Sequence, residues 1–203
     1  MELLLDRLQG PAEAAFALLS ADEKVRADRL RDPLLRHRFM LARAFLRRAL
    51  GARLGRDPDG LEFHYSAGGK PLLDGIHFNL SHTADRLALV ISTRHPVGVD
   101  IEVLRAVDAR AIAGVHFAPA EAATLARSAE PLPAFFRLWT RKEAVLKAHG
   151  LGITHSLAVL PKAWVRDFVP GIGYAGALAW VGDETPLAIR RRHLDSSVLE
   201  NAT

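Results

Sequence analysis

The chain contains no cysteine, which excludes a disulfide framework, a thiolate nucleophile and a zinc–thiolate site. Any metal chemistry must therefore use carboxylates or histidines. Long apolar runs are also missing, since no stretch approaches the roughly eighteen residues that a membrane-spanning helix needs. At the N-terminus, Glu2 and Asp6 bracket a leucine cluster, unlike the basic-then-apolar pattern of a secretory signal. These absences predict a cytoplasmic protein without a membrane span.

Arginine supplies most of the positive charge, and lysine is scarce. The 203 residues carry a formal net charge of +4, and the pI is about 9.8. That balance favours an acidic partner such as nucleic acid, a phosphorylated ligand or an acidic protein. Hydrophobic residues make up 49% of the chain, enough for a packed core in one domain or two small ones. The five lysines are Lys24, Lys70, Lys142, Lys147 and Lys162.

Start and stop signals predict three helices in the first fifty residues, the first over residues 11–19. Ser20 and Glu23 have the spacing of a capping box, which starts a second helix that ends near residue 31. Asp32 followed by proline predicts a third helix to residue 50, with Gly51 as its stop. For most of the arginines on this helix, a solvated polar face is the simplest explanation. These arginines are Arg36, Arg38, Arg43, Arg47 and Arg48.

After the third helix, the pattern becomes extended. A short strand is predicted at residues 61–65, followed by a glycine turn at residues 67–69 and then by Lys70. Lys70 is either surface decoration or a cation beside a sharply bent backbone that suits a phosphate.

Apolar and polar side chains alternate over residues 76–81, and an apolar run covers residues 87–91. Together these two segments predict a β-hairpin. A tight connection leads from it to a third strand at residues 97–103. We expect the three strands to form an antiparallel meander, which would bring Ser81 and His82 close to the third strand. His82 is then either a loop histidine of no consequence or a donor to a ligand's phosphate.

The third strand carries two acids on one face. Val99 and Ile101 point to one side of residues 97–103, while Asp100 and Glu102 point to the other. Two such carboxylates lie about 6.6 Å apart at roughly 3.3 Å per residue. Like-charge repulsion disfavours this arrangement unless a cation or water relieves it. Mg²⁺ suits an oxygen-rich pair of this kind, and the plainer alternative is a solvent-facing edge strand.

The second half of the chain repeats the order of helices followed by strands, although no residue-level repeat accompanies it. We therefore predict an α+β protein made of two similar halves, residues 1–97 and 98–203, with a loosely held polar tail at residues 193–203. The helices are predicted at residues 108–115, 120–128 and 133–149, the last with Gly150 as its stop, and the strands at 157–160, 163–168, 174–181 and 187–190.

The helix at residues 133–149 places Glu143 and Lys147 one turn apart. As an exposed salt bridge, such a pair contributes only about 0.3–0.5 kcal/mol. The pair lies beside a broad aromatic stripe that must be buried, which would hold the Glu143 carboxylate at the edge of the core. A carboxylate in that position needs a partner.

Five short motifs, in this order along the chain, resemble those of the 4′-phosphopantetheinyl transferase superfamily. They are residues 69–72 (Gly-Lys-Pro-Leu), 79–82 (Asn-Leu-Ser-His), 98–102 (Gly-Val-Asp-Ile-Glu), 117–121 (Phe-Ala-Pro-Ala-Glu) and 139–147 (Trp-Thr-Arg-Lys-Glu-Ala-Val-Leu-Lys). The length and the doubled element order resemble the larger, surfactin-synthetase-type class. That resemblance implies two α+β halves related by pseudo-twofold symmetry, with the active site at their junction.

The resemblance implies transfer of the 4′-phosphopantetheine arm of coenzyme A to a serine of an apo acyl or peptidyl carrier protein, with release of adenosine 3′,5′-bisphosphate. Mg²⁺ is the implied cofactor, with Asp100, Glu102 and Glu143 as its ligands and Glu143 also as the base for the carrier serine. Because Ile101 cannot ligate, water and substrate would complete the coordination. We also expect a monomer, and a carrier with an acidic recognition surface.

The resemblance also implies contacts with coenzyme A. Lys147 would pair with the pyrophosphate and, with Glu143, form the catalytic pair. Ser81 and His82 would contact phosphates, His82 the 3′-phosphate, and Lys70 would contact the nucleotide end. Arg38 is the best match for a further 3′-phosphate ligand, and the alternatives to it are Arg31, Arg36 and Arg43.

Two other functions compete with this one. A basic nucleic-acid-binding domain would use the arginines of the third helix and would explain the pI, but not the carboxylates. A metal-dependent phosphodiesterase acting on a nucleotide would use the same three acids with water as the nucleophile.

Overall fold

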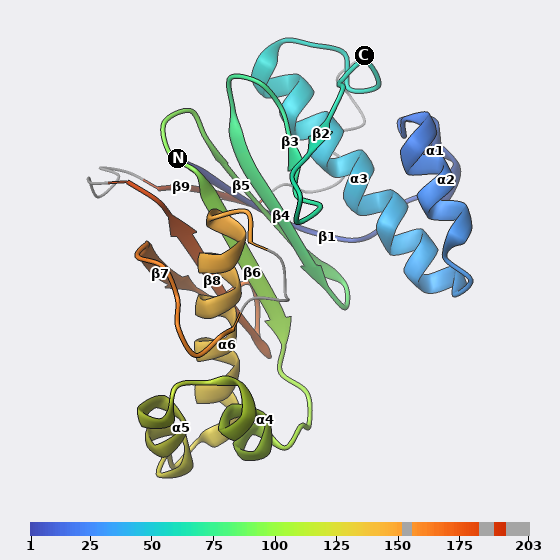
Figure 1. Ribbon diagram of the computed structural model, residues 1–203. Coiled ribbons are helices and arrows are strands. Elements are labelled where there is room, and N and C mark those ends of the chain that lie inside the picture. The colour runs from blue at the N-terminus through green and yellow to red at the C-terminus, as the bar shows by residue number, and fades with distance from the viewer. Residues whose placement is uncertain (152–155, 183–188, 194–203) are drawn as a thin grey trace.

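The computed structural model describes residues 1–151, 156–182 and 189–193, the last three through their backbone. Helices and short strands alternate along the chain (Figure 1). In order, the elements are β1 (Glu2–Arg7), α1 (Ala12–Ala17), α2 (Ala21–Arg29), α3 (Pro33–Leu54), β2 (His64–Tyr65), β3 (Pro71–Leu72), β4 (His77–Thr83), β5 (Arg86–Ser92), β6 (Val97–Val103), α4 (Ala109–His116), α5 (Pro119–Ala126), α6 (Pro131–Ala148), β7 (Trp164–Phe168), β8 (Tyr174–Trp180) and β9 (Arg190–His193).

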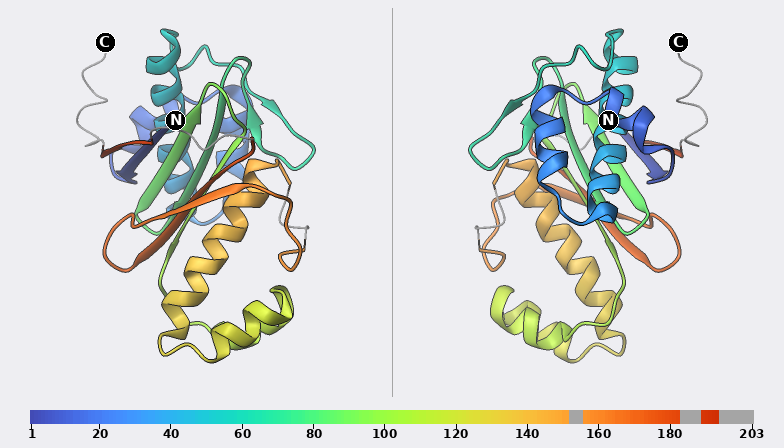
Figure 2. Two further views of the ribbon diagram at one scale, coloured as in Figure 1. Left: turned by 90° about the vertical axis from the view of Figure 1, so that its left-hand side faces the viewer. Right: turned by 90° about the vertical axis from the view of Figure 1, so that its right-hand side faces the viewer.

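The main body has four layers: α3, a first sheet, a second sheet and α6 (Figures 1 and 2). The first sheet has the strand order β4-β5-β1-β9, and the second has the order β6-β8-β7. β2 and β3 form a separate two-stranded ribbon. The α+β class is confirmed. The division at residue 97 and the pseudo-twofold relation stay predictions, and β9 pairs with β1 across that division.

The first sheet buries both of its faces. Leu4 packs with Phe45 and Leu46 of α3 on one side. Leu3 and Leu5, the neighbours of Leu4 along β1, point the other way and pack against the second sheet. Alternate side chains of a strand point to opposite faces, so β1 is apolar on both and shows no polar–apolar alternation.

α6 covers the outer face of the second sheet through small side chains. Ala144 and Ala148 of α6 pack against Ala177 and Ala179 of β8. At Gly98 the helix touches the backbone of β6, because a Cβ placed on Gly98 would lie 2.1 Å from the carbonyl oxygen of Ala144. Glycine therefore allows a helix-to-strand approach that no other residue would permit. The aromatic end of α6 packs with α4 and α5, which form a small subassembly below the sheets in Figure 1.

The three helices predicted in the first half are present, and the main difference is the C-terminal end of α3. Asp32 caps α3, and its carboxylate accepts a hydrogen bond of 2.8 Å from the Leu34 amide. The helix does not stop at Gly51 as predicted but continues to Leu54, and Gly55, with φ of 63°, ends it. Gly51 is needed for another reason: a Cβ there would lie 2.7 Å from the carbonyl oxygen of Arg56, where the chain folds back.

The predicted meander is wrong, although its hairpin is right. β4 and β5 pair as an antiparallel hairpin. β6 leaves that sheet and pairs instead with β8, with Asp100 opposite Ala177. The reason is that β5 already pairs on its other side with β1, which occupies the place expected for β6.

In the second half, all three predicted helices are present, with α6 starting two residues early at Pro131. The predictions at residues 163–168 and 174–181 correspond to β7 and β8. The strand predicted at 157–160 is wrong, since these residues form bends. The strand predicted at 187–190 falls largely outside the described residues, as does the tail beyond His193. No helix in the described ranges combines the length and apolarity that crossing a bilayer requires.

Candidate active site

The site forms on the face of β6 that looks toward α6. Asp100 is buried, with 4% of its surface exposed. Its Oδ1 accepts a hydrogen bond of 2.6 Å from Lys147 Nζ and one of 2.9 Å from the Ser81 hydroxyl. Its Oδ2 is also buried and has no hydrogen-bond partner in the described part of the chain. A buried carboxylate oxygen without a partner is costly, which indicates that a cation or donor is missing there.

Two polar side chains of β4 attach the edge of the first sheet to β6. Asn79 Oδ1 accepts a hydrogen bond of 2.8 Å from the amide of Val99, and Ser81 Oγ accepts one of 3.3 Å from the amide of Ile101. The expected proximity of residues 79–82 to Asp100 is therefore present, through side chains and not through strand pairing. Sequence reasoning missed this role of Asn79, for which the only signal is a polar side chain on an otherwise buried strand.

Glu143 lies one helical turn before Lys147, is 7% exposed and makes no hydrogen bond or ion pair with any described residue. A salt bridge between the two, which the sequence left open as the plainer alternative, is not formed, because Lys147 pairs with Asp100 instead. Burial raises the pKa of Glu143, and although Lys147 opposes the shift, the charges of Asp100 and Glu102 add to it. These effects indicate that Glu143 shares a local field with both acids of β6.

Glu102 lies two residues along β6 from Asp100, at the rim of the site. Its Oε2 accepts a hydrogen bond of 2.9 Å from Arg105, a residue that sequence reasoning missed, and one of 3.4 Å from the Thr83 hydroxyl. Burial and the neighbouring Asp100 carboxylate together raise the pKa of Glu102 despite the guanidinium of Arg105. Repulsion between the acids is therefore only partly relieved by the protein's own cations.

The fit of these acids to a metal ion can be judged from their partners. Within the described ranges, no three His, Cys, Asp or Glu side chains lie close enough to hold a metal ion as they stand. The chemistry of the donors nevertheless suits Mg²⁺: Asp100 offers a buried unpaired oxygen, and Glu143 adds a second buried carboxylate whose pKa is raised by burial. The metal assignment of Asp100, Glu102 and Glu143 stays a prediction that this donor set supports.

Three basic side chains from three elements converge beside the acids. Desolvation lowers the pKa of His82 on β4, and the positive charges of Lys147 on α6 and Arg38 on α3 lower it further. Among the alternatives to Arg38, Arg36 pairs with Asp28 and Arg43 with Glu23. A bound phosphate would relieve the effect of these positive charges on His82, and Arg38 as a coenzyme contact stays a prediction.

The side chain of Lys70 contacts the backbone of two other elements. Its Nζ donates hydrogen bonds of 2.8 Å to the carbonyl oxygen of Val97 and 2.6 Å to that of Lys147. Desolvation lowers the pKa of the Lys70 ammonium to about 8. The ammonium thus already has two acceptors from the protein, and its predicted contact with the nucleotide end stays a prediction.

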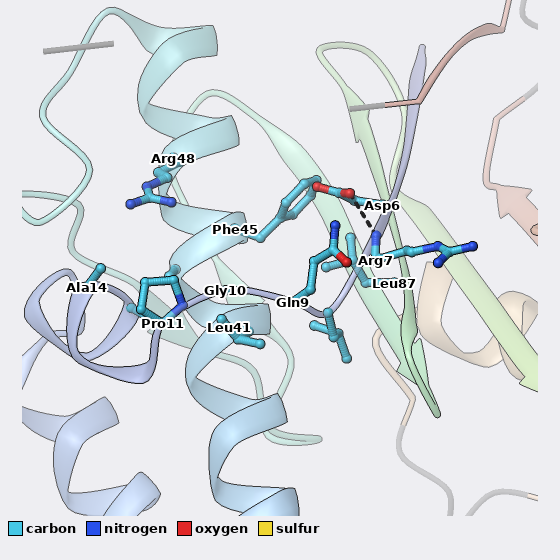
Figure 3. Close-up of a pocket in the computed structure, with 13 residues that line it drawn as sticks. Asp6, Arg7, Gln9, Gly10, Pro11, Ala14, Leu41, Phe45, Arg48 and Leu87 are labelled. Atoms are coloured by element: carbon cyan, nitrogen blue, oxygen red, sulfur yellow. Dashed lines mark hydrogen bonds between the residues drawn. The ribbon is translucent and has the colours of Figure 1, made fainter. Parts of the chain in front are cut away.

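A hollow of about 270 Å³ lies elsewhere, between α3 and the connection from β1 to α1 (Figure 3). Apolar side chains such as Leu41 and Phe45 form much of its wall, with Arg48 at its margin (Figure 3). None of the site residues predicted from the sequence lines it. The residues that the sequence predicts for the site therefore lie away from this hollow.

Comparisons with known proteins point to one family. A family model described as the 4′-phosphopantetheinyl transferase superfamily matches residues 96–195. The 4′-phosphopantetheinyl transferase HetI of a Nostoc species is 37% identical over 158 residues, which cover 73% of this chain and 67% of HetI. The 4′-phosphopantetheinyl transferase of Bacillus subtilis is 28% identical over 152 residues, covering 71% of this chain and 66% of the relative.

A shorter match has higher identity. The 4′-phosphopantetheinyl transferase AcpT of Salmonella typhimurium is 42% identical over 95 residues, which cover 44% of this chain and 50% of AcpT. The chain thus spans between half and about two thirds of the length of these three relatives.

Proposed function

The chain belongs to the 4′-phosphopantetheinyl transferase superfamily, and we propose that it transfers the 4′-phosphopantetheine arm of coenzyme A to a serine of an apo acyl or peptidyl carrier protein. The observation that carries this proposal is the hydrogen-bonded group formed by the buried Asp100 and Ser81 with the partly exposed Lys147, in which the buried Asp100 Oδ2 has no partner among the described residues. Acids and cations lie together there, as a reaction on a metal-bound pyrophosphate requires.

The cations of the site bind and orient the coenzyme. Lys147 contacts the pyrophosphate, with Ser81 beside it, since the two side chains already lie 3.4 Å apart. His82 and Arg38 hold the 3′-phosphate, which supplies the negative charge that their neighbourhood lacks. Anchoring both phosphate groups fixes the reacting phosphorus relative to α6, and such positioning accounts for much of the catalysis in phosphoryl transfer.

Glu143 acts as the base. Burial raises its pKa above that of an exposed glutamate, which strengthens it as a proton acceptor. Directly or through a water molecule, it takes the proton of the carrier serine as the serine oxygen attacks the phosphorus that bears the pantetheine arm. The bond from that phosphorus to the bridging oxygen breaks, and adenosine 3′,5′-bisphosphate leaves with the electron pair.

Asp100, Glu102 and Glu143 would hold Mg²⁺, which when bound neutralises the charge that develops on the bridging oxygen. Asp100 contributes the unpaired Oδ2. Glu102 must give up part of its contact with Arg105, an exchange made easy by the half-exposed position of that guanidinium. A cytoplasmic, monomeric enzyme and an acidic carrier surface belong to the same proposal.

The experiment is to mix the protein with coenzyme A, Mg²⁺ and a panel of apo carrier proteins, and to weigh the carriers by intact mass spectrometry. We expect at least one carrier to gain one phosphopantetheine mass, and chelation of Mg²⁺ to stop the gain. If no carrier across the panel gains that mass, the proposal is wrong for this chain. Release of adenosine 3′,5′-bisphosphate without any carrier would instead favour a phosphodiesterase.

The competing function in nucleic-acid binding loses support from the fate of two arginines. Arg43 and Arg47 are buried and pair with Glu23, which is fully buried, so they are not available to a phosphate backbone. Salt-sensitive retention of duplex DNA, independent of Mg²⁺, would revive it.

A further inference from the structure

We propose that Lys70 is a positioning residue that sets where the end of α6 lies on β6, and thereby the contact between Lys147 and Asp100. The inference rests on the proposed function. It assigns the Lys70 ammonium to two carbonyl oxygens of the protein, where the family resemblance implies a contact with the nucleotide end of the coenzyme.

The backbone of Lys70 is fixed by a tight turn. The amide of Lys70 donates to Ser66 Oγ across 3.1 Å, and its carbonyl oxygen accepts from the amide of Ser66 across 2.9 Å. Gly69, with φ of 76°, provides the left-handed residue that this turn requires. The root of the long side chain is thus held firmly, so its ammonium can act as a spacer of defined length.

The ammonium joins two elements that are far apart in sequence. Val97, the first residue of β6, offers one carbonyl oxygen, and Lys147, in the last turn of α6, offers the other. The carbonyl oxygen of Lys147 also accepts a hydrogen bond of 3.2 Å from the amide of Gly150. Carbonyl groups at the C-terminal end of a helix carry partial negative charge, which suits a cation. Figure 2 shows the β2–β3 ribbon, which carries Lys70 in its turn, beside that end of α6.

The backbones of the two elements also approach each other closely at the neighbouring residue, Gly98. A Cβ on Gly98 would lie 2.1 Å from the Ala144 oxygen and 2.4 Å from the Ala148 nitrogen. At Gly98, helix and strand therefore meet without a side chain between them. The two hydrogen bonds from Lys70 add a direct link between the end of the helix and the start of the strand beside this contact.

The position of the end of α6 also affects the acidic residues of the site. Lys147 lends its carbonyl oxygen to Lys70 and its ammonium to Asp100, so the two contacts share one residue of α6. Glu143 lies one turn earlier on the same helix. A shift of the helix end by about 1 Å would move both Lys147 and Glu143 relative to Asp100, and displacements of that size can cost about 100-fold in rate.

The test compares Lys70→Met with the wild-type protein and with Lys162→Met, in which an exposed lysine without a side-chain partner in the described residues is replaced by the same residue. Three quantities are measured: hydrogen exchange of the amides in the last turn of α6, the affinity for coenzyme A by calorimetry, and kcat. For Lys70→Met we expect exchange to be about tenfold faster, kcat about tenfold or more lower, and affinity within threefold. Lys162→Met should match the wild type in all three.

Loss of coenzyme affinity by tenfold or more, with exchange unchanged, would overturn the inference and make Lys70 a coenzyme contact. Unchanged exchange and unchanged kcat would overturn it as well. If Lys70→Met fails to fold, Lys70→Arg takes its place. Lys70→Arg keeps the positive charge but replaces the compact ammonium. We expect faster hydrogen exchange in the last turn of α6 and an unchanged affinity for coenzyme A. A drop in that affinity would overturn the inference. Hydrogen exchange needs no activity, so it separates failure of this inference from failure of the proposed function.

Discussion

Lys147 Nζ on α6 and Asp100 Oδ1 on β6 lie 2.6 Å apart, and this ion pair joins the helix to the acid strand at the centre of the site. The lysine keeps 29% of its side chain exposed, whereas the aspartate keeps 6%. The cation thus reaches in from the open side and neutralises a carboxylate that cannot turn toward water. A ligand that brings its own cation can take over that task and leave the lysine free to bind phosphate.

Asp100→Asn should reduce phosphopantetheinyl transfer by at least about 100-fold, because it removes a metal ligand and the charge that holds Lys147. Intact mass of the carrier over time measures the rate. Asp167→Asn is the matched control, since Asp167 pairs with Arg141 on the exposed side of α6, and its rate should stay within about twofold. Transfer by Asp100→Asn at the wild-type rate would remove Asp100 from the metal site.

Lys147→Met should change metal binding and transfer in opposite directions. Without the ammonium, Asp100 loses its internal counter-ion, so Mg²⁺ should bind to the coenzyme-free protein at least about threefold more tightly in calorimetry. Transfer should nevertheless fall, because the pyrophosphate loses a cation. Weaker metal binding in this variant would show that Lys147 does not compete with the metal for Asp100.

His82→Ala should raise the KM for coenzyme A by about tenfold and leave kcat within a few fold, because the 3′-phosphate lies away from the reacting phosphorus. Dephospho-coenzyme A, which lacks that phosphate, supplies the control. The wild type should bind it about as weakly as the variant binds coenzyme A, and the variant should lose little more. A further tenfold loss in the variant would mean that His82 contacts another part of the coenzyme.

Glu23→Gln should lower the free energy of unfolding by about 3–5 kcal/mol, because the fully buried carboxylate of Glu23 receives the guanidinium groups of Arg43 and Arg47. Urea denaturation measures the change. Asp28→Asn, which breaks the exposed pair with Arg36, should cost less than about 1 kcal/mol. Equal losses in the two variants would contradict the distinction between the buried and the exposed pair.

The same pair predicts a dependence on acid. Burial alone would raise the pKa of Glu23, but Arg43 and Arg47 outweigh it, so the pKa in the folded protein lies below the usual value of 4.5. A depressed folded pKa means that the stabilisation is present above pH 4.5 and is lost as the pH falls through the folded pKa. The stability difference between wild type and Glu23→Gln should therefore shrink in acid.

Lys70 should make the free energy of unfolding depend on pH in the alkaline range. Its pKa is about 8 in the folded protein against 10.5 in the unfolded chain, so the unfolded state binds more protons between these values. Stability of the wild type should then rise from pH 8 to 10.5, relative to Lys70→Met, by at most about 3 kcal/mol. Parallel stability curves for the two proteins over this range would show that the ammonium is not desolvated.

Most of the helices could be predicted from local signals in the sequence. Asp32 before a proline and the capping box at Ser20 and Glu23 are satisfied by short-range hydrogen bonds, so neighbouring residues suffice to locate those helix starts. Gly51 shows the limit of this reasoning. Glycine is required there because the chain folds back at Arg56 and leaves no room for a Cβ. From the sequence alone, such a glycine looks the same as one that ends a helix.

Strand order was harder to predict. The run of leucines in β1 was not recognised as a strand, since a strand buried on both faces loses the alternation that marks one. Because β1 was not recognised, β6 was predicted to pair with β5, whose second edge is in fact occupied by β1. The proximity of Ser81 to Asp100 was still predicted, but from an expected strand pairing, whereas the structure brings the two residues together through hydrogen bonds of the Ser81 side chain. The two carbonyl oxygens that Lys70 contacts were not predicted, because no local pattern shows which carbonyl oxygens a long side chain will reach.

The parallel pairing of β9 with β1 has a consequence for how the protein forms during synthesis. β1 emerges from the ribosome first and obtains its partner on one side from β5, yet the other side stays an open strand edge until residues 190–193 are made. An open edge invites pairing with other chains, and closing it across nearly the whole sequence is slow. A nascent chain halted before β9 is therefore where this protein should aggregate most readily.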